Sequence, residues 1–193
     1  ISMQDKVLKT LEFTKIIAHL QKHASSSLGK SLIEELTPKT DLDEVKHSQF
    51  ETDQAATVYR LKGNVPLGGI FDIRSHIKRA RIGGVLSPTE LMETSSTLRA
   101  GRNLRRFLED MQENEIELPI LYDYKDNLVN MSDLEKDINI AIGDNGEVLD
   151  SASDTLRTLR QQLRTNEARV REKLESMIRS SNAAKMLSDA IVT

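Results

Sequence analysis

Apolar residues recur every three or four positions through most of this chain, which is the spacing of amphipathic α-helices. The first such run covers residues 7–23, where Leu11, Ile16 and Leu20 follow this spacing. Further runs predict helices over residues 28–36, 42–62, 73–82, 88–111 and 118–129. The pattern therefore predicts a mainly α-helical fold in which short loops join amphipathic helices.

An alternating pattern of apolar and polar residues, which is typical of a β-strand, occurs in one place. Residues Ile138–Ile142 alternate, Gly143–Gly146 has the composition of a tight turn, and Glu147–Leu149 returns. We therefore predict one small β-hairpin over residues 138–149, placed directly before the last helix. Such a hairpin would fasten the base of that helix to the rest of the fold.

Helix ends are marked most clearly at Ser87, where the sequence Ser-Pro-Thr-Glu predicts a capping box. Ser87 is the expected N-cap, Pro88 the first helical residue, and Glu90 the residue that completes the box. Asp41 is the expected N-cap of the helix over residues 42–62, which ends at Gly63. These signals fix the boundaries of two of the predicted helices.

The last helix is the longest, because residues 150–179 contain no Gly or Pro and many strong helix formers. At about 1.5 Å per residue it would be about 45 Å long, which is more than a compact domain of this size needs. Apolar residues occupy every seventh position, as in a coiled coil: Leu149, Leu156, Leu163, Val170 and Met177. The second series of coiled-coil positions turns polar at Asn166 and Lys173. We therefore predict a helical core domain over residues 3–149 and a protruding lever helix over residues 150–180, solvated towards its tip.

The composition limits the class of protein. The 193 residues are 38% hydrophobic and 30% charged, which suits a helix-rich and somewhat elongated fold. There is no Cys, so disulfides and cysteine metal sites are excluded and a cytoplasmic location is expected. No apolar run approaches the roughly 18 residues of a membrane span, and only 4% of residues are aromatic. Stacking on nucleic-acid bases is therefore not the expected mode of binding.

The net charge of −3 conceals a strong segregation of charge along the chain. Residues 60–106 contain ten basic and three acidic residues, whereas residues 109–154 contain fourteen acidic and two basic ones. Residues 157–179 turn basic again, with seven basic residues and three acidic ones. Two interpretations remain open: solvated faces with pairing between segments of opposite sign, or a basic surface that contacts nucleic-acid phosphates.

One segment resembles a phosphate-binding loop, but its context argues against a nucleotide site. Residues 24–31 read Ala-Ser-Ser-Ser-Leu-Gly-Lys-Ser, with Ala24 in place of the first glycine. A functional loop of this kind follows a buried strand, whereas here an amphipathic helix precedes it. The serines are therefore expected to cap a short helix, and Lys30 to be a solvated residue.

No catalytic, cofactor-binding or metal-binding constellation emerges from the remaining polar residues. His19 and His23 are four residues apart on one helix face but lack a third ligand. Asp144 and Asn145 begin like a calcium loop that the following residues do not complete. We therefore predict that this chain holds no catalytic residues, no cofactor and no metal.

The arginines of the long helix are the candidate contacts to nucleic acid. They are spaced by three, four and seven residues, which places them along one ridge beside the apolar stripe: Arg157, Arg160, Arg164 and Arg171. The competing interpretation is a solvated helix face with local ion pairs such as Glu167–Arg171 and Arg171–Glu175.

Taken in order, several segments resemble the core and lever region of the MutS family. They are LEFTKIIAHL, SSLGKSLIEELTP, VPLGGIFDIRSHIKRA, GGVLSPTEL and SDLEKDINIAIGDNGEVLDSASDTLRTLRQQL. The resemblance covers residues 3–193 and is greatest to the second bacterial paralogue, because core-type sequence begins at once. Residues 181–193 are similar to the start of the clamp region, so the sequence is expected to be an excised part of a longer protein.

The resemblance implies a function for the longer protein rather than for this segment. Proteins of this kind are similar to dimeric ABC-type ATPases with a nuclease-like Smr domain at their far end, and they use ATP and magnesium. They are associated with suppressing homologous recombination on branched DNA and with rescuing collided ribosomes by splitting their subunits. The phosphate-binding loop, the magnesium site and the Smr domain lie outside this chain.

We therefore expect this chain to be the core and lever part of a MutS-like ATPase that binds nucleic acid or a ribosome. The expected partners are branched DNA or ribosomal RNA, a second copy of the parent protein, and no membrane. The alternative is a stand-alone helical adaptor that binds a partner through the coiled-coil face of its long helix.

Overall fold

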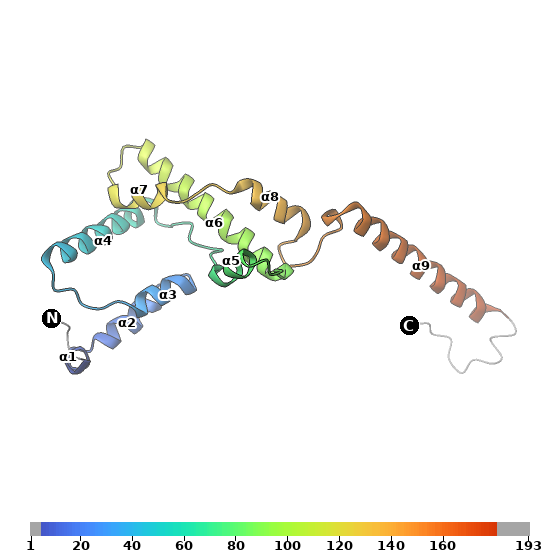
Figure 1. The fold of residues 1–193 in the computed structure, drawn as a ribbon, viewed down its shortest axis with the longest axis horizontal. Helices are drawn as coiled ribbons and strands as arrows, with labels where there is room; N and C mark the ends of the chain where they lie inside the picture. The colour runs from blue at the N-terminus through green and yellow to red at the C-terminus, as the bar shows by residue number, and fades with distance from the viewer. Residues whose placement is uncertain (1–4, 181–193) are drawn as a thin grey trace.

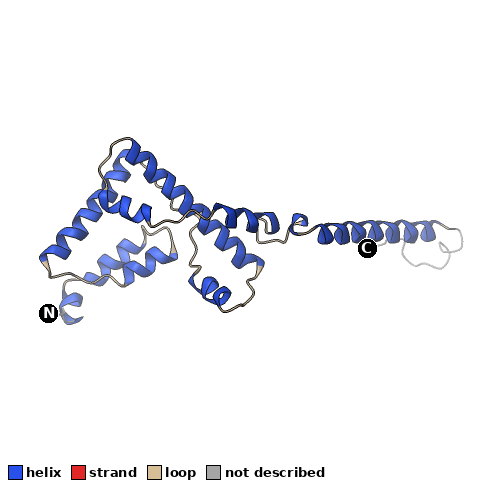
Figure 2. Cartoon of the chain, turned by 45° about the horizontal axis from the view of Figure 1, so that its top comes forward, coloured by secondary structure: helices blue, strands red, loops and turns tan. Residues whose placement is uncertain are grey.

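A computed structural model describes residues 5–180 of the chain, and almost all of its regular structure is helical (Figures 1 and 2). The prediction of a mainly α-helical fold is therefore confirmed. The elements are α1 (Asp5–Thr10), α2 (Phe13–Gln21), α3 (Ser27–Glu34), α4 (Leu42–Lys62), α5 (Arg74–Arg81), α6 (Pro88–Glu113), α7 (Pro119–Asp126), α8 (Ser132–Ala141), the 3-10 helix η1 (Asp150–Ala152) and α9 (Asp154–Arg179).

The capping signals in the sequence mark the helix ends that the structure shows. The Ser87 hydroxyl accepts a hydrogen bond from the Glu90 amide at 3.2 Å, and Glu90 accepts one from the Ser87 amide at 2.8 Å. This is the predicted capping box, with Pro88 as the first residue of α6. Asp41 caps α4, which ends at Gly63 with φ of 70°. That left-handed backbone favours glycine and turns the chain out of the helix.

The predicted β-hairpin is wrong in its first strand. Residues 138–141 form the last turn of α8, and Ile142 follows directly after it. The pairing with the returning segment is a single antiparallel bridge between Ile142 and Val148. The reason is tertiary: α8 packs on α6, and Ile138 in its last turn and Ile142 directly after it are buried. A short alternating run also fits a helix, and the packing surface of α6 decides between the two.

The first predicted helix is likewise divided. Glu12 has φ of 55°, which separates α1 from α2, although residues 7–23 carry one apolar pattern. Helix α2 packs on both α1 and α3, and the Gln21 amide of α2 donates to the Glu34 carboxylate of α3 at 2.9 Å.

The hydrophobic core lies where α4, α6 and α7 meet. Val58, Met111 and Leu118 are buried there, and Met111 is fully inaccessible to solvent. Gln54 of α4 joins this core through polar contacts, because its carbonyl oxygen accepts hydrogen bonds from the Ile120 and Leu121 amides at 3.0 and 3.2 Å. Gln54 thus caps the first turn of α7 from a neighbouring helix.

Polar contacts fasten the helices of this body to one another. Arg102 of α6 makes two parallel hydrogen bonds, of 3.0 and 3.1 Å, to the buried Glu135 of α8. The Ser95 hydroxyl donates to Asn139 of α8 at 2.5 Å, and Lys125 of α7 donates to Gln112 of α6 at 2.6 Å. Helix α6 is therefore the central element, bonded to α7 near its end and to α8 along its length.

The loop between α4 and α5 lies against α6. The Ser96 hydroxyl donates to the Gly69 carbonyl at 2.9 Å, and the Phe71 amide donates to the Thr97 hydroxyl at 3.0 Å. A Cβ atom at Gly69 would lie 2.9 Å from the Ser96 hydroxyl, and its φ is 79°. Glycine therefore permits this close approach of loop and helix.

Helix α9 extends away from the rest of the molecule, at the end opposite the N-terminus (Figure 1). Within the described residues it packs on η1, which in turn packs on α8. No helix among residues 5–180 is long and apolar enough to cross a membrane. The predicted clamp residues 181–193 lie outside the described part of the chain, and the division into a core domain and a lever stays a prediction.

Candidate functional site

Among residues 5–180, the contacts that tie the long helix to the body lie at the base of α9, and they centre on Asp150 of η1. Arg160 donates to the Asp150 carboxylate at 2.8 Å and to the Val148 carbonyl at 2.8 Å. Arg164, one turn further along α9, donates to the second Asp150 oxygen at 3.3 Å. We call Val148, Asp150, Arg160 and Arg164 the lever joint, because these contacts fix where α9 points.

The lever joint is fastened to α8 by hydrogen bonds to carbonyl groups in the last turn of that helix. The Leu149 amide donates to the Ala141 carbonyl at 2.9 Å, and the Ser151 hydroxyl donates to the Ile140 carbonyl at 2.6 Å. Ser153 then caps α9, since its hydroxyl accepts from the Leu156 amide at 3.0 Å. The end of α8, η1 and the first turns of α9 thus form one continuous hydrogen-bonded unit.

The charge of Asp150 is held in place by its two arginines. The hydrogen bond from Arg160 lowers the pKa of the Asp150 carboxyl below its ordinary value, and Arg164 adds to the shift. Asp150 is therefore ionised across the neutral range, and both of its oxygens serve as acceptors. Charge-assisted hydrogen bonds of this kind can hold α9 at a fixed angle even though the joint is accessible to water.

The four candidate arginines differ in how they are engaged. Arg160 and Arg164 form ion pairs with Asp150, and Arg157 forms one with Asp154 at 3.2 Å in the first turn of α9. Arg171 is exposed and forms no ion pair with another described residue. Their role as contacts to nucleic acid stays a prediction, which is best supported for Arg171 and least for Arg160.

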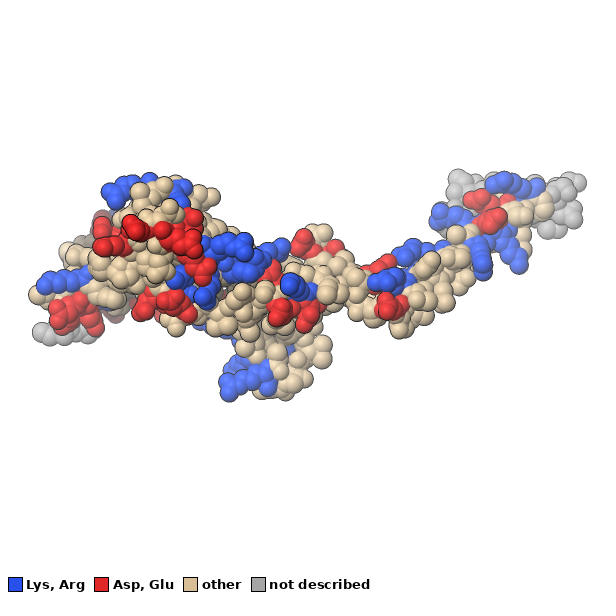
Figure 3. Space-filling view, turned by 90° about the horizontal axis from the view of Figure 1, so that it is seen from above, with Lys and Arg blue, Asp and Glu red and all other residues tan. Residues whose placement is uncertain are grey.

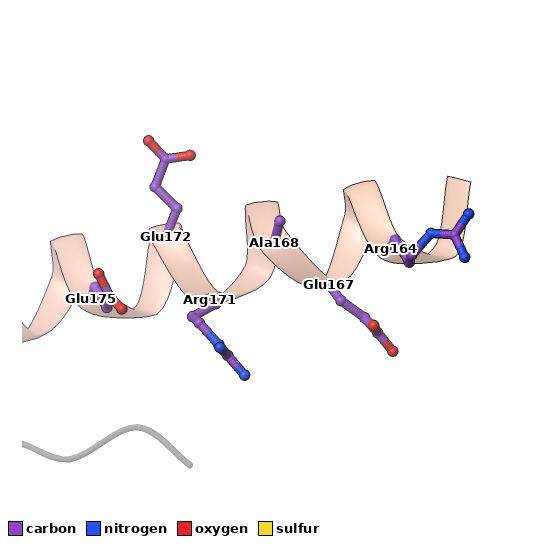
Figure 4. Close-up of a pocket in the computed structure, with 6 residues that line it drawn as sticks. All are labelled: Arg164, Glu167, Ala168, Arg171, Glu172 and Glu175. Atoms are coloured by element: carbon purple, nitrogen blue, oxygen red, sulfur yellow. The ribbon is translucent and has the colours of Figure 1, made fainter. Parts of the chain in front are cut away.

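The outer half of α9 carries charges of both signs. A shallow surface pocket there is lined by Arg164, Glu167, Ala168, Arg171, Glu172 and Glu175 (Figure 4). Figure 4 shows Glu172 directed to the opposite side of the helix from Arg171 and Glu167. Glu175 pairs with Arg179 at 3.1 Å, and the predicted pairs of Arg171 with its neighbouring glutamates are not formed. This alternation of sign makes the outer half a solvated face of mixed charge.

The apolar stripe of α9 is exposed beyond its first turn. Leu156 is half-buried at the base, whereas Leu163 has 58% of its surface exposed. The same holds for Leu159, Val170, Leu174 and Met177. The expected burial of the base therefore extends to Leu156 but not to Leu163.

In the rest of the molecule, residues of the basic segment form ion pairs with residues of the acidic segment. This agrees with the first interpretation of the charge pattern, in which segments of opposite sign pair. Lys62 contacts Asp110 at 3.0 Å, Arg105 contacts Glu109 at 2.9 Å, and Arg102 contacts Glu135. Figure 3 shows basic and acidic side chains side by side over much of the body. Helix α5 differs, because its Lys78 and Arg81 form no ion pair with another described residue.

The structure also brings together a group that the sequence does not reveal. His76 of α5 is buried, with its Nε2 atom 2.7 Å from Glu93 and its Nδ1 atom 3.6 Å from Glu90. Glu90 contacts Arg79 as well, at 2.8 Å. The two glutamates lie one turn apart on α6, so this cluster docks α5 on α6. No local spacing rule connects residue 76 with residues 90 and 93, because they lie on different helices.

Neither of the other candidate motifs assembles a ligand site. Ser26 caps α3, because its hydroxyl accepts from the Gly29 amide at 3.0 Å, and Lys30 is exposed, as predicted for the loop-like segment. The rings of His19, on α2, and His23, two residues beyond its end, lie 5.6 Å apart. Within residues 5–180, no three His, Asp or Glu side chains gather in an arrangement that could hold a metal ion.

Comparison with known proteins extends the resemblance found in the motifs. The chain is 54% identical over 191 residues to the endonuclease MutS2 of Bacillus cereus strain B4264, and 55% identical over 191 residues to that of Bacillus mycoides strain KBAB4. Both matches cover 99% of this chain and 24% of the relative, so the chain spans about a quarter of the length of the curated relatives it matches. No family model matches the sequence. The resemblance to the MutS family is thereby confirmed, and the chain matches a segment of its second bacterial paralogue, MutS2.

Proposed function

We propose that this chain is the core and lever part of a MutS-like ATPase that binds nucleic acid. The observation that supports this most directly is the 54% identity that extends over 99% of the chain. ATP and magnesium would be bound outside this chain, in a protein that forms a homodimer in the cytoplasm. The chain's own task would then be mechanical.

The arrangement of α9 suits a mechanical task. A helix of 26 residues is about 39 Å long, so a rotation of about 10° at its base moves its far end by about 7 Å. The lever joint gives that base a defined angle, since Arg160 contacts both η1 and the segment that leads from α8. A change in the body could therefore be passed to whatever the far end of α9 carries.

The physiological substrate would be branched DNA, with suppression of homologous recombination, or a collided ribosome whose subunits are split. Both present a dense array of phosphates, so both would be recognised through Lys and Arg. The two differ in size and in the presence of RNA, and binding of the whole protein to four-way DNA junctions and to collided ribosomes would separate them.

The proposed function is tested by breaking the joint in the whole protein. Asp150→Ala leaves Arg160 and Arg164 without their acceptor and frees the angle of α9. We expect ATP hydrolysis to persist, whereas the change in nucleic-acid affinity between the ATP-bound and ADP-bound protein shrinks towards none. Arg169→Ala is the matched control, because this exposed residue of α9 makes no contact to η1.

The Asp150→Ala protein could instead show the same change in nucleic-acid affinity between its ATP-bound and ADP-bound states as the wild type. In that case α9 does not transmit the nucleotide state. If the wild-type whole protein hydrolyses no ATP, or binds neither junctions nor ribosomes, the proposed function itself is wrong. The two measurements therefore distinguish failure of the lever hypothesis from failure of the proposed function.

The exposed apolar stripe of α9 supports the second candidate, a stand-alone adaptor that binds a partner helix. An adaptor of this sequence would occur in cells as a chain of 21.7 kDa, whereas the first proposal requires a polypeptide several times larger. An antibody raised against the body would distinguish them by the size of the band in a native cell extract. A single band near 22 kDa would favour the adaptor.

A further inference from the structure

Helix α5 has two chemically different faces. Its inner face docks on α6 through His76, which contacts Glu93, and through Arg79, which contacts Glu90. Its outer face carries Arg74, Lys78 and Arg81, which follow an i, i+4, i+7 spacing and therefore lie along one side of the helix. All three side chains are exposed.

The cations of this outer face are less neutralised than those of α9. Lys78 and Arg81 form no ion pair with another described residue, and only Arg74 is paired, with Asp72 at 2.6 Å. In Figure 2 α5 projects from α6, and the corresponding projection in Figure 3 shows basic atoms with no acidic atoms beside them. By contrast, glutamates alternate with arginines along the outer half of α9.

We propose that Arg74, Lys78 and Arg81 of α5 form a binding surface for the phosphates of one nucleic-acid strand. This inference rests on the proposed function for the class of ligand and adds the place where it is bound. The three residues span seven helical steps, or about 10 Å along the axis of α5. One DNA strand advances about 3.4 Å per phosphate, so that length faces about three phosphates.

The chemistry of the surface favours the backbone over the bases. No aromatic side chain lies on α5. The Lys and Arg side chains of the outer face bind phosphate groups whatever the base sequence of the nucleic acid. Docking by His76 and Arg79 holds α5 in a fixed orientation, so the outer cations are presented together. A cation near a helix C-terminus also stabilises the helix dipole, but that effect requires neither three cations nor a shared face.

The inference is tested with Lys78→Ala/Arg81→Ala in the full 193-residue chain, using fluorescence anisotropy of a labelled DNA duplex of mixed sequence. Loss of two phosphate contacts should weaken binding roughly tenfold to a hundredfold at low salt. The slope of log affinity against log salt should become shallower by about 1.8. Because both residues are exposed, the thermal unfolding midpoint should stay unchanged.

The matched control is Lys22→Ala/Lys30→Ala, which changes the net charge equally through two exposed residues, one directly after α2 and one in α3. Equal weakening by both double variants would overturn the inference, since the effect would then follow net charge alone. Wild-type binding that Lys78→Ala/Arg81→Ala leaves intact would overturn it too.

Three further outcomes would overturn this inference without deciding against the proposed function. If Arg164→Ala/Arg171→Ala alone weakens duplex binding, the contact lies on α9, and the proposed function stands while the inference fails. If polyglutamate binds more tightly than the duplex and depends on Lys78 and Arg81, the surface takes an acidic protein and the inference is overturned. If the wild-type chain binds no duplex at low salt, the inference fails, and the Asp150→Ala experiment on the whole protein still decides the proposed function.

Discussion

The body formed by α4, α6, α7 and α8 and the arm formed by α9 are held by different kinds of contact. In the body, apolar side chains such as Met111 are buried, and ion pairs such as Arg102–Glu135 lie between helices. In the arm, the apolar stripe is exposed and a few polar contacts at one end fix its direction. Tertiary packing therefore stabilises the body, whereas helix propensity, capping and the lever joint stabilise the arm.

The two parts should therefore respond separately to substitution. A residue of the body acts on cooperative unfolding, because removing it weakens several helices at once. A residue of the arm acts on local helicity or on the angle of α9, because little else depends on it. A substitution in one part can therefore be matched with a counterpart in the other.

The largest effect is expected from Met111→Ala. Met111 is fully buried between α4, α6 and α7, so the substitution leaves a cavity and should cost about 2–5 kcal/mol of unfolding free energy. Its counterpart Leu163→Ala removes a side chain that is 58% exposed and should cost less than about 0.5 kcal/mol. Urea unfolding followed by circular dichroism measures both.

Leu156→Ala should fall between these two, because Leu156 is half-buried at the base of α9. Equal losses for Leu156→Ala and Leu163→Ala would show that something covers the stripe in solution. Equal losses for Met111→Ala and Leu163→Ala would contradict the comparison itself.

A smaller effect is expected from Glu135→Ala. The substitution leaves Arg102 without the carboxylate to which it donates two hydrogen bonds and should cost about 1.5–3 kcal/mol. Because Arg102 is partly exposed, water can replace part of the lost contact. The control is Glu167→Ala on α9, an exposed residue for which the unfolding midpoint should not move. A neutral Glu135→Ala would mean that α8 is held to α6 by apolar packing alone.

The sequence predicts those parts of the fold that local signals specify. Asp41, Gly63, Ser87 and Glu90 mark helix ends by chemistry within a few residues, and all four act as predicted. The strand predicted at Ile138–Ile142 is wrong because a short alternating run fits a helix as well, and the choice depends on α6, about 40 residues away in sequence. Glu12 breaks the first helix with no local signal, since neither Gly nor Pro is present there.

The lever joint could be predicted only in part. Residues 150–179 are helical enough to predict one element, but Ser153 starts α9 and Asp150 lies before it in η1. Two successive start signals, Asp150 and Ser153 with Asp154, are present in the sequence and could have indicated a break. The bonds from Arg160 and Arg164 back to Asp150 depend on the turn that η1 makes, which no spacing rule for a continuous helix describes.

An effect of about 1 kcal/mol is expected from removing a helix cap, and it should differ in kind between body and arm. Ser87→Ala removes the capping box of α6, the central helix, and should lower the midpoint of cooperative unfolding. Ser153→Ala removes the equivalent cap of α9 and should leave that midpoint unchanged while the first turn of α9 frays. Amide hydrogen exchange at Leu156 would report the fraying. A lowered midpoint for Ser153→Ala would mean that the arm unfolds together with the body.

The smallest effect concerns the angle of the arm rather than its stability, and pH provides the test. Since Arg160 and Arg164 lower the pKa of Asp150, the contribution of this carboxylate is fully present above the unfolded pKa of about 3.9. It is lost as pH falls through the lower folded pKa, because protonation removes the charge that the arginines hold. The chain has no Cys, so spin labels at Asn103→Cys and Arg169→Cys can report the distance from α6 to α9 without competing thiols.

We expect this distance distribution to be narrow at neutral pH and to broaden only as pH falls below about 3.9 and through the lowered pKa of Asp150, where the joint loosens. Asp150→Asn should broaden it at neutral pH and make it insensitive to acid. A second label pair within the body, at Asn103→Cys and Lys136→Cys, separates loosening of the joint from acid unfolding, because α6 and α8 are also bonded through Ser95 and Asn139. If both distance distributions broaden together, acid loosens α8 and α9 alike, and α9 does not move independently of the body. If only the arm distance broadens, one ionised carboxylate sets the direction of α9.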